Sequence, residues 1–326
     1  MPLTDLPLDE LRAYRPDIPE PADFDAFWSE TLDRARSHAG EPTVSPVQDH
    51  LLTAFDVHDV RFPGWNGEPV AAWLMLPRGV RGRLPTVIRY IGYGGGRGLP
   101  TDHLLMPAAG YAQLVVDSRG QGHDTPDRGE GSGTQWVAGL MTRGVEDPRN
   151  HYYRRLMTDS VRAVDAARAL PQVDPERIVV SGASQGGGLT LAVAGLVGDL
   201  VAGALIDVPF LCHYRRGADI ASLGPYVEIS DYLRRHSQRM LETTFTTLSY
   251  FDGVHFAARA TAPTLFSVGL MDPICPPSTV FAAYHRYAGE RDIRVWQFAD
   301  HGGGYGATAH EQLSWLRDHG LAPKEA

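Results

Sequence analysis

The fold is decided by the stretch RIVVSGASQGGG, residues 177–188, in which four glycines gather around a Ser–Gln pair directly after a β-branched run. β-branched side chains favour a strand, whereas glycine weakens regular structure, so the backbone must turn sharply here. We predict a strand, a tight turn that displays Ser184, and a helix over 185–197. Gly182 and Gly186 would leave room for the strand and the helix to pack closely.

Short apolar runs of the same kind recur on both sides of this stretch, and each runs into Gly, Asp or Pro. They are PTVIRYIGY (85–93), AQLVVDSRG (112–120), VAGALIDVP (201–209), PTLFSVGLMD (263–272) and IRVWQFADHG (293–302). Helical patterns lie between most of them; over 156–170, for example, apolar residues recur at helical spacing. This alternation predicts a mostly parallel sheet with helices on both faces.

The chain before these runs has a different pattern. Residues 22–37 read as an amphipathic helix. The segments FDVHDVRF (55–62) and EPVAAWLML (68–76) flank FPGWNG, so they predict an antiparallel hairpin whose tight turn lies at Asn66 and Gly67.

The predicted architecture is one α/β domain over residues 1–326, with antiparallel N-terminal strands followed by a mostly parallel sheet. Residues 1–50 are interpreted as an N-terminal helical extension. Residues 210–260 look helical and aromatic and break the strand–helix alternation. We therefore interpret them as a helical insertion over the active site.

The composition restricts the partners. With 30 basic and 39 acidic residues the formal net charge is −9, which argues against nucleic acid, since phosphate binding needs basic patches. The two cysteines, Cys212 and Cys275, cannot form a disulfide framework in a chain of 326 residues, so a reducing compartment is expected. The first residues do not resemble a signal peptide, and no apolar run approaches the ~18 residues of a membrane span.

Ser184 is the predicted nucleophile. It is the centre of GASQG, residues 182–186, which fits the pattern G-x-S-x-G. In a nucleophile elbow this Ser has a strained backbone between a strand and a helix. The pentapeptide also occurs by chance, and the alternative is a glycine-rich packing turn with an incidental Ser. The strand–turn–helix context favours the nucleophile.

A serine hydroxyl is a poor nucleophile until a base takes its proton, and in this arrangement an acid and then a His follow the Ser along the chain. His301 is the predicted base because it follows a strand and opens a glycine-rich turn. Asp272 is the predicted acid because it ends the strand before the His strand. Asp207 is the second candidate, and for Asp272 the alternative is a turn-capping role before Pro273.

The tetrahedral intermediate of acyl transfer needs hydrogen-bond donors aimed at its oxyanion. One predicted donor is the backbone N–H of Gln185, the residue after the nucleophile. The other should come from the loop IGYGGGRG, residues 91–98, where Tyr93 is the best-placed donor. No G-K-[ST] follows this loop, so it is not a phosphate-binding loop, and no dinucleotide fingerprint is present. We expect no cofactor.

Two further expectations concern the surroundings of the nucleophile. The histidines at 123, 151 and 213 share no ligand spacing, so no metal site is expected, and Cys275 is interpreted as a small apolar filler. The acyl side of the pocket should admit an acetyl group and little more. The residues predicted to close it are Phe210, Leu211, Ile274 and Pro276.

Several longer segments carry a resemblance to a known family. They include YRPDIPEPADFDAFW (14–28), YIGYGGGRG (90–98), DSRGQG (117–122), GASQGGG (182–188), DVPFLCHYRR (207–216), SVGLMDPICPPSTVFAAYH (267–285) and DHGGG (300–304). Together they resemble the acetyl xylan esterases and cephalosporin C deacetylases of carbohydrate esterase family seven, which have the α/β-hydrolase fold. The resemblance covers nearly the whole chain.

The resemblance implies a metal-independent serine esterase that removes acetyl groups from sugars, xylo-oligosaccharides and cephalosporin C through an acyl-enzyme. It implies the triad Ser184, Asp272 and His301, and a cytoplasmic homohexamer built as a trimer of dimers. It also implies a structural role for Arg119 in the RGQG segment. Two positions depart from the family pattern: Gly302 replaces the usual Glu after the catalytic His, and Gly94 replaces the usual Asn after the oxyanion Tyr.

Two other functions fit the same fold. A serine peptidase of this type usually carries a large extra domain that restricts access, and no segment of this chain is long enough to form one. A non-catalytic binding protein would usually lack the Ser or the His, and both are present. The esterase is therefore the favoured interpretation.

Overall fold

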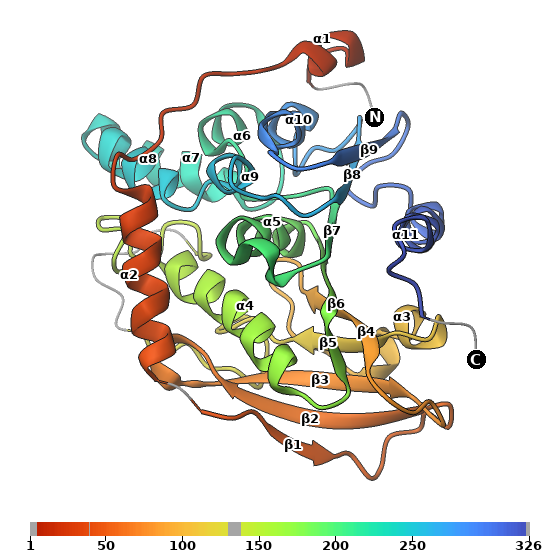
Figure 1. Ribbon diagram of the computed structural model, residues 1–326. Coiled ribbons are helices and arrows are strands. Elements are labelled where there is room, and N and C mark those ends of the chain that lie inside the picture. Colours follow the sequence, from red (N-terminus) through yellow and green to blue (C-terminus); the bar gives the residue numbers. More distant parts are fainter. Residues whose placement is uncertain (1–4, 39, 130–137, 324–326) are drawn as a thin grey trace.

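The computed structural model describes residues 5–38, 40–129 and 138–323 (Figure 1). Its centre is a nine-stranded sheet in the order β1-β2-β3-β5-β4-β6-β7-β8-β9. The strands are β1 (Thr43–Pro46), β2 (Phe55–Pro63), β3 (Pro69–Pro77), β4 (Leu84–Tyr90), β5 (Ala112–Val116), β6 (Val173–Ala183), β7 (Gly203–Asp207), β8 (Thr264–Gly269) and β9 (Arg291–Trp296). Pairs among β1, β2, β3 and β5 are antiparallel, and all others are parallel. The predicted mixed, mostly parallel sheet is confirmed.

Helices cover both faces of this sheet, as Figure 1 shows. Neighbouring strand residues point to opposite faces, so Val180 packs against α4 (Tyr152–Ala169) and α5 (Gln185–Val197), whereas Val179 packs toward α3 (Leu105–Ala108) and α11 (Gly306–Asp318). The remaining helices are α1 (Leu8–Ala13), α2 (Phe24–Ser37), α6 (Tyr214–Ile220), α7 (Tyr226–His236), α8 (Leu241–Ser249), α9 (Gly253–Ala257) and α10 (Pro277–Arg286), with short 3₁₀ turns at Trp65–Gly67, Pro100–Asp102, Gly198–Leu200 and Ser237–Met240. Among the residues described, no helix is both long and apolar enough to cross a bilayer.

The hairpin at the start of the sheet forms as predicted. β2 pairs with β3 antiparallel, and Asn66 and Gly67 in the connection have φ of 51° and 73°. Left-handed backbone of this kind is what an Asn-Gly pair supplies at low cost. The strand β1 was not predicted, because residues 1–50 were expected to form a helical extension. All four of its residues are exposed, so it lacks the alternating apolar pattern by which a strand is recognised.

Four helices, α6 to α9, fall within the stretch predicted as helical, 210–260. The helical character of that stretch is confirmed. Its description as an insertion over the active site, and the assignment of the chain as one domain, remain predictions. The direction of the strands determines where a site can form. Because β4, β6, β7, β8 and β9 run parallel, the loops after them gather at one edge of the sheet.

Candidate active site

Ser184 lies on a sharp turn between β6 and α5. Its φ of 58° and ψ of −122° are a strained conformation for a residue with a side chain. A Cβ on Gly182 would lie 2.2 Å from the Gly186 carbonyl carbon, and one on Gly186 would lie 2.3 Å from the Tyr90 carbonyl oxygen. The turn closes this tightly only because both positions are glycine, which confirms the predicted close packing of strand and helix.

The segment after β7 holds this turn from the other side. The Ser184 N–H donates to the Asp207 carbonyl oxygen over 3.0 Å, and the Phe210 N–H donates to the Ser184 carbonyl oxygen over 2.9 Å. Within the same segment Val208, Leu211 and His213 have φ of 37°, 66° and 47°. Positive φ in residues other than glycine costs free energy and clusters at functional sites. Sequence reasoning had no signal for the strain at Val208 and Leu211, since neither residue type favours positive φ.

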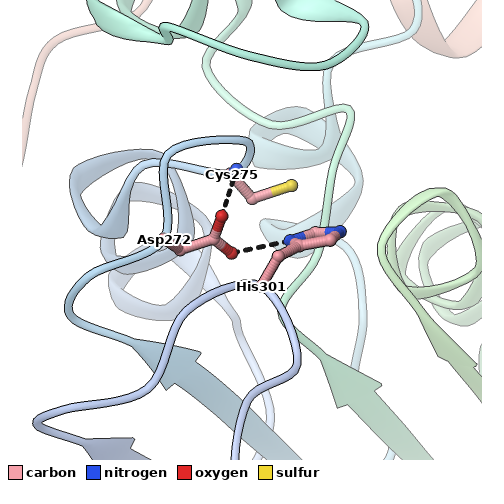
Figure 2. Close-up of side chains that lie close together, drawn as sticks. All are labelled: Asp272, Cys275 and His301. Carbon is pink, nitrogen blue, oxygen red and sulfur yellow. Dashed lines mark hydrogen bonds and ion pairs between the residues drawn. The ribbon is translucent and has the colours of Figure 1, made fainter. Parts of the chain in front are cut away.

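Asp272 and His301 are brought together by the loops after β8 and β9 (Figure 2). His301 Nδ1 lies 2.7 Å from Asp272 Oδ2. The other carboxylate oxygen, Oδ1, accepts the N–H groups of Ile274 and Cys275 over 2.8 and 2.9 Å. Asp272 is buried, with 1% of its surface exposed. The carboxylate is thus fixed with one oxygen facing the imidazole, an arrangement that selects the ring orientation and tautomer of a catalytic His.

Asp207, the second candidate for the acid, has other partners. Its Oδ1 accepts the hydroxyl of Ser267. Burial raises the pKa of Asp207, while the Ser267 hydrogen bond and the charge of Arg89 act in the opposite direction. The His301 ring forms its hydrogen bond with Asp272 instead. The geometry therefore favours Asp272 over Asp207 as the partner of the imidazole.

Cys275 lies next to Asp272 and His301. Its thiol is fully buried, and its side chain points toward the His301 ring (Figure 2). Burial and then the charge of Asp272 raise the pKa of the Cys275 thiol well above its usual value, and a hydrogen bond with the Ser184 side chain opposes them. The Cys275 thiol therefore lies near both Ser184 and the Asp272–His301 pair.

The two predicted oxyanion donors lie on connected loops. Gln185 is the first residue of α5, so its backbone N–H is one of those that a helix leaves without an intrahelical acceptor. The Gln185 side chain receives a hydrogen bond from Gln121 over 2.8 Å, and Gln121 Oε1 accepts the N–H of Gly94 over 2.6 Å. The side-chain amide of Gln185 also donates, through Nε2, to the Ile91 carbonyl oxygen over 3.2 Å. These bonds fix the Tyr93 loop relative to the Ser184 turn.

The side chain of Tyr93 anchors the same loop to α7. Its hydroxyl donates to Glu228 Oε1 over 2.7 Å and accepts the Leu140 N–H over 2.6 Å. Glu228 Oε2 in turn accepts the Met141 N–H over 3.1 Å. Burial raises the pKa of Glu228, and its hydrogen bond with Tyr93 acts in the opposite direction. With the side chain occupied in this way, the predicted oxyanion donor of Tyr93 would have to be its backbone N–H.

Arg119 takes the structural position that the RGQG segment implied. The guanidinium is fully buried and donates to both carboxylate oxygens of Asp159, over 2.5 and 2.9 Å, and to Glu68 over 2.5 Å. Asp159 also accepts the N–H of Trp65 over 2.8 Å. Arg119 therefore ties the hairpin turn, α4 and the loop after β5 together.

The four residues predicted to close the acyl pocket occupy different surroundings. The Phe210 ring meets Tyr93 edge-on, with centroids 6.3 Å apart. Leu211 lies against α5, where a Cβ on Gly188 would come within 2.9 Å of it. Ile274 packs in the same manner against Gly224, and Pro276 is buried at the start of α10. Their function as an acyl pocket remains a prediction.

The absence of a side chain at Gly302 has a local explanation. A Cβ there would lie 2.2 Å from the Tyr305 ring, which occupies that space. The Tyr305 hydroxyl donates to Asp300 Oδ1 over 3.0 Å, and the Gly302 N–H donates to the same oxygen over 2.9 Å. The two hydrogen bonds, that of Gly302 first, lower the pKa of Asp300. The loop that carries His301 is thus braced by Asp300 and Tyr305.

Comparison with known proteins gives one consistent result. The family model described as acetyl xylan esterase (AXE1) matches residues 1–319. The structure is similar to an acetyl xylan esterase from Paenibacillus sp. R4, with 40% identity, a TM-score of 0.91, and coverage of 97% of this chain and 100% of that one. It is also similar to acetyl xylan esterase 1 from Thermoanaerobacterium sp. JW/SL YS485, with 35% identity, a TM-score of 0.87 and coverage of 96% and 99%.

Among curated proteins, the acetyl esterase Axe7A of Xylanibacter ruminicola is 26% identical over 311 residues, which are 93% of this chain and 68% of that protein. The family match spans nearly the whole chain, and the two solved structures cover it almost end to end. The chain therefore belongs to the acetyl xylan esterase (AXE1) family and is a carboxylic ester hydrolase with the α/β-hydrolase fold.

Proposed function

We propose that this protein is a serine esterase that removes acetyl groups from sugars, including xylo-oligosaccharides, and from cephalosporin C. The observation that carries the proposal is the Asp272–His301 hydrogen bond of 2.7 Å beside the strained turn of Ser184. The names of the similar proteins, acetyl xylan esterase and acetyl esterase, support acetyl as the acyl group. Deacetylation of cephalosporin C rests on the family resemblance.

In the first half of the reaction, Ser184 Oγ attacks the ester carbonyl while His301 Nε2 takes the hydroxyl proton. Asp272 holds the proton on Nδ1 and stabilises the imidazolium that forms. The carbonyl oxygen becomes an oxyanion and accepts the backbone N–H groups of Tyr93 and Gln185. The intermediate collapses as His301 returns the proton to the leaving alcohol, and the acetyl group stays on Ser184.

In the second half, His301 takes a proton from water, and the resulting nucleophile attacks the acetyl-Ser184 carbonyl. The same two N–H groups stabilise the second oxyanion. Collapse returns the proton from His301 to Ser184 Oγ and releases acetic acid, which ionises to acetate in solvent. Every proton is carried by His301, so the proposed mechanism needs no cofactor.

The acyl group should be short. If Phe210, Leu211, Ile274 and Pro276 close the acyl side, each added methylene has to displace packed side chains. Discrimination per methylene in such pockets is about 1–3 kcal/mol, or roughly 10–200-fold. By this rule, we expect kcat/KM for p-nitrophenyl acetate to exceed kcat/KM for the butyrate by well over about tenfold. The octanoate should be essentially unreactive.

The three p-nitrophenyl esters should be measured side by side, and a panel of acetylated xylo-oligosaccharides and cephalosporin C ranked by kcat/KM should follow. The panel identifies which alcohol portion of the ester the enzyme prefers, and the p-nitrophenyl series identifies which acyl group it prefers. A kcat/KM that rises with chain length would mean a lipase-like channel, and the deacetylase proposal would have to be abandoned.

A serine peptidase and a non-catalytic binding protein were the alternatives. Membership of the esterase family argues against both. The cytoplasmic location remains a prediction that rests on the family resemblance, and the two free cysteines, Cys212 and Cys275, fit a reducing compartment.

The protein should also assemble, as a homohexamer built from three dimers. The hairpin and the N-terminal helix add surface that a minimal hydrolase core does not need, and the family resemblance implies that such additions mediate assembly. Light scattering at micromolar concentration should give about six times the 35.7 kDa of one chain. A particle of 35.7 kDa would refute the assembly.

A further inference from the structure

Three side chains that can bind a metal ion meet at the proposed base, and His301 is one of them. The carboxylate of Asp272, the thiol of Cys275 and a ring nitrogen of His301 each offer one ligand atom, and these atoms lie within 4.8 Å of one another. Figure 2 shows Asp272 and Cys275 on one loop and His301 on the next, with the carboxylate facing the His301 ring and the sulfur of Cys275 beside that ring. In the part of the chain that the structure describes, this is the one grouping of three or more such side chains at this spacing.

The ligand types and the rigidity of the cluster suit a borderline-soft cation. Thiolate, imidazole and carboxylate are the three ligands that Zn²⁺ takes in proteins, with bond lengths of about 2.0–2.3 Å. Ligand atoms around such an ion lie roughly 3.5 Å apart, so Asp272 Oδ2 and His301 Nδ1, which are 2.7 Å apart, would have to separate slightly while Cys275 Sγ moves closer. Asp272 is already oriented by the N–H groups of Ile274 and Cys275 on Oδ1, which leaves Oδ2 for the ion.

We propose that Asp272, Cys275 and His301 form an inhibitory binding site for thiophilic divalent cations, with Zn²⁺ and Cd²⁺ as the representative ions. The ion takes the place of the proton between Asp272 Oδ2 and His301 Nδ1 and binds Cys275 Sγ as its third protein ligand. Water completes the coordination shell, since the His301 side chain retains 24% of its exposure.

The protons balance without any redox step. Cys275 loses its thiol proton to solvent when the sulfur–metal bond forms. The proton of His301 Nδ1 is replaced by the metal, and the ring takes one at Nε2 instead. Nε2 then has no lone pair with which to accept the Ser184 hydroxyl proton. The ion therefore switches off the base and also occupies the Cys275 thiol, which lies near Ser184. Loss of activity rests on the proposed role of His301, whereas binding does not.

The activity test compares Zn²⁺ titrations of the full chain after removal of metal with a chelator. Each variant is normalised to its own metal-free rate with p-nitrophenyl acetate. Wild type should be inhibited, and EDTA should restore its activity. Cys275→Ala should raise the half-inhibitory Zn²⁺ concentration at least about tenfold, because a whole ligand is lost. Cys275→Ser, which keeps the side-chain volume, should behave in the same way and guards against a folding defect.

The matched control is Cys212→Ala, which removes the other buried thiol and should leave the half-inhibitory concentration unchanged. Cys212 Sγ lies 3.6 Å from the Phe210 carbonyl oxygen, so it has a different environment. Inhibition of both Cys275 variants at the wild-type Zn²⁺ concentration would overturn the proposal, as would a wild type that Zn²⁺ does not inhibit.

A binding measurement separates this site from the mechanism. Cd²⁺ bound to thiolate gives a charge-transfer absorption in the ultraviolet, which requires no catalysis. Ser184→Ala should show the band at one equivalent of Cd²⁺, and the double variant Ser184→Ala, Cys275→Ser should lose it. A band that survives without Cys275 would contradict the site. If the band behaves as expected while Ser184→Ala retains esterase activity, the proposed mechanism fails and the metal site stands.

Discussion

Replacing Ser184 by Ala should lower kcat by about 10³–10⁶-fold, and replacing His301 by Ala should cost the same order. The two residues act as a unit, since the hydroxyl is a weak nucleophile without the base and the base has nothing to activate without the hydroxyl. The rate that remains would come from the oxyanion donors and from substrate binding. The measurement is kcat with p-nitrophenyl acetate, together with a melting curve to show that each variant is folded.

The double variant sharpens this test. If Ser184 and His301 work together, removing both should cost no more than removing one. Losses that multiply in the double variant would show that the two side chains act independently, and they would contradict the proposed mechanism.

Replacing Asp272 by Asn should lower kcat by about 10⁴-fold, because an amide holds the imidazole in the wrong tautomer while the base itself remains. The structural reason is specific: Asp272 Oδ2 meets His301 Nδ1 over 2.7 Å, and two backbone N–H groups fix the other oxygen. Asp207→Asn is the matched control, since Asp207 ends the neighbouring strand and hydrogen-bonds Ser267 instead. It should be mild by comparison.

Both variants should be compared by kcat at one pH with the same ester. If Asp207→Asn is the damaging change and Asp272→Asn is mild, the assignment of the acid is wrong. The control matters because Asp207 is half-buried and its backbone carbonyl accepts the Ser184 N–H, so a general effect of disturbing the elbow would appear in it as well.

The elements around Ser184 were predictable because the local signals are strong. The β-branched run and the glycines fixed the start of α5 at Gln185, and the Asn66-Gly67 pair fixed the hairpin connection. The positions of Asp272 and His301 followed from a topological rule, that side chains after parallel strands meet at one edge of the sheet. Local composition and this rule together were enough to bring the two residues to one site.

The supports of the site were not predictable, because they depend on contacts between distant segments. Gln121 joins Gly94 to Gln185, and Glu228 joins Tyr93 to α7. Neither residue has a local pattern that indicates such a partner. The same holds for Tyr305, which fills the space beside Gly302 only because the loop folds back on itself. The exposed strand β1 was missed for a different reason, since it has no buried side chain to produce an alternating pattern.

The central claim is that Ser184 is the nucleophile, and active-site labelling tests it most directly. A fluorophosphonate reacts with an activated serine when the hydroxyl oxygen displaces fluoride from phosphorus and the base takes the proton. Incubation of the wild type followed by peptide mass spectrometry should find the label at Ser184 alone, with activity lost in step with labelling, and His301→Ala should label far more slowly. A label on another residue, or full labelling of the His301→Ala variant at the wild-type rate, would contradict the claim.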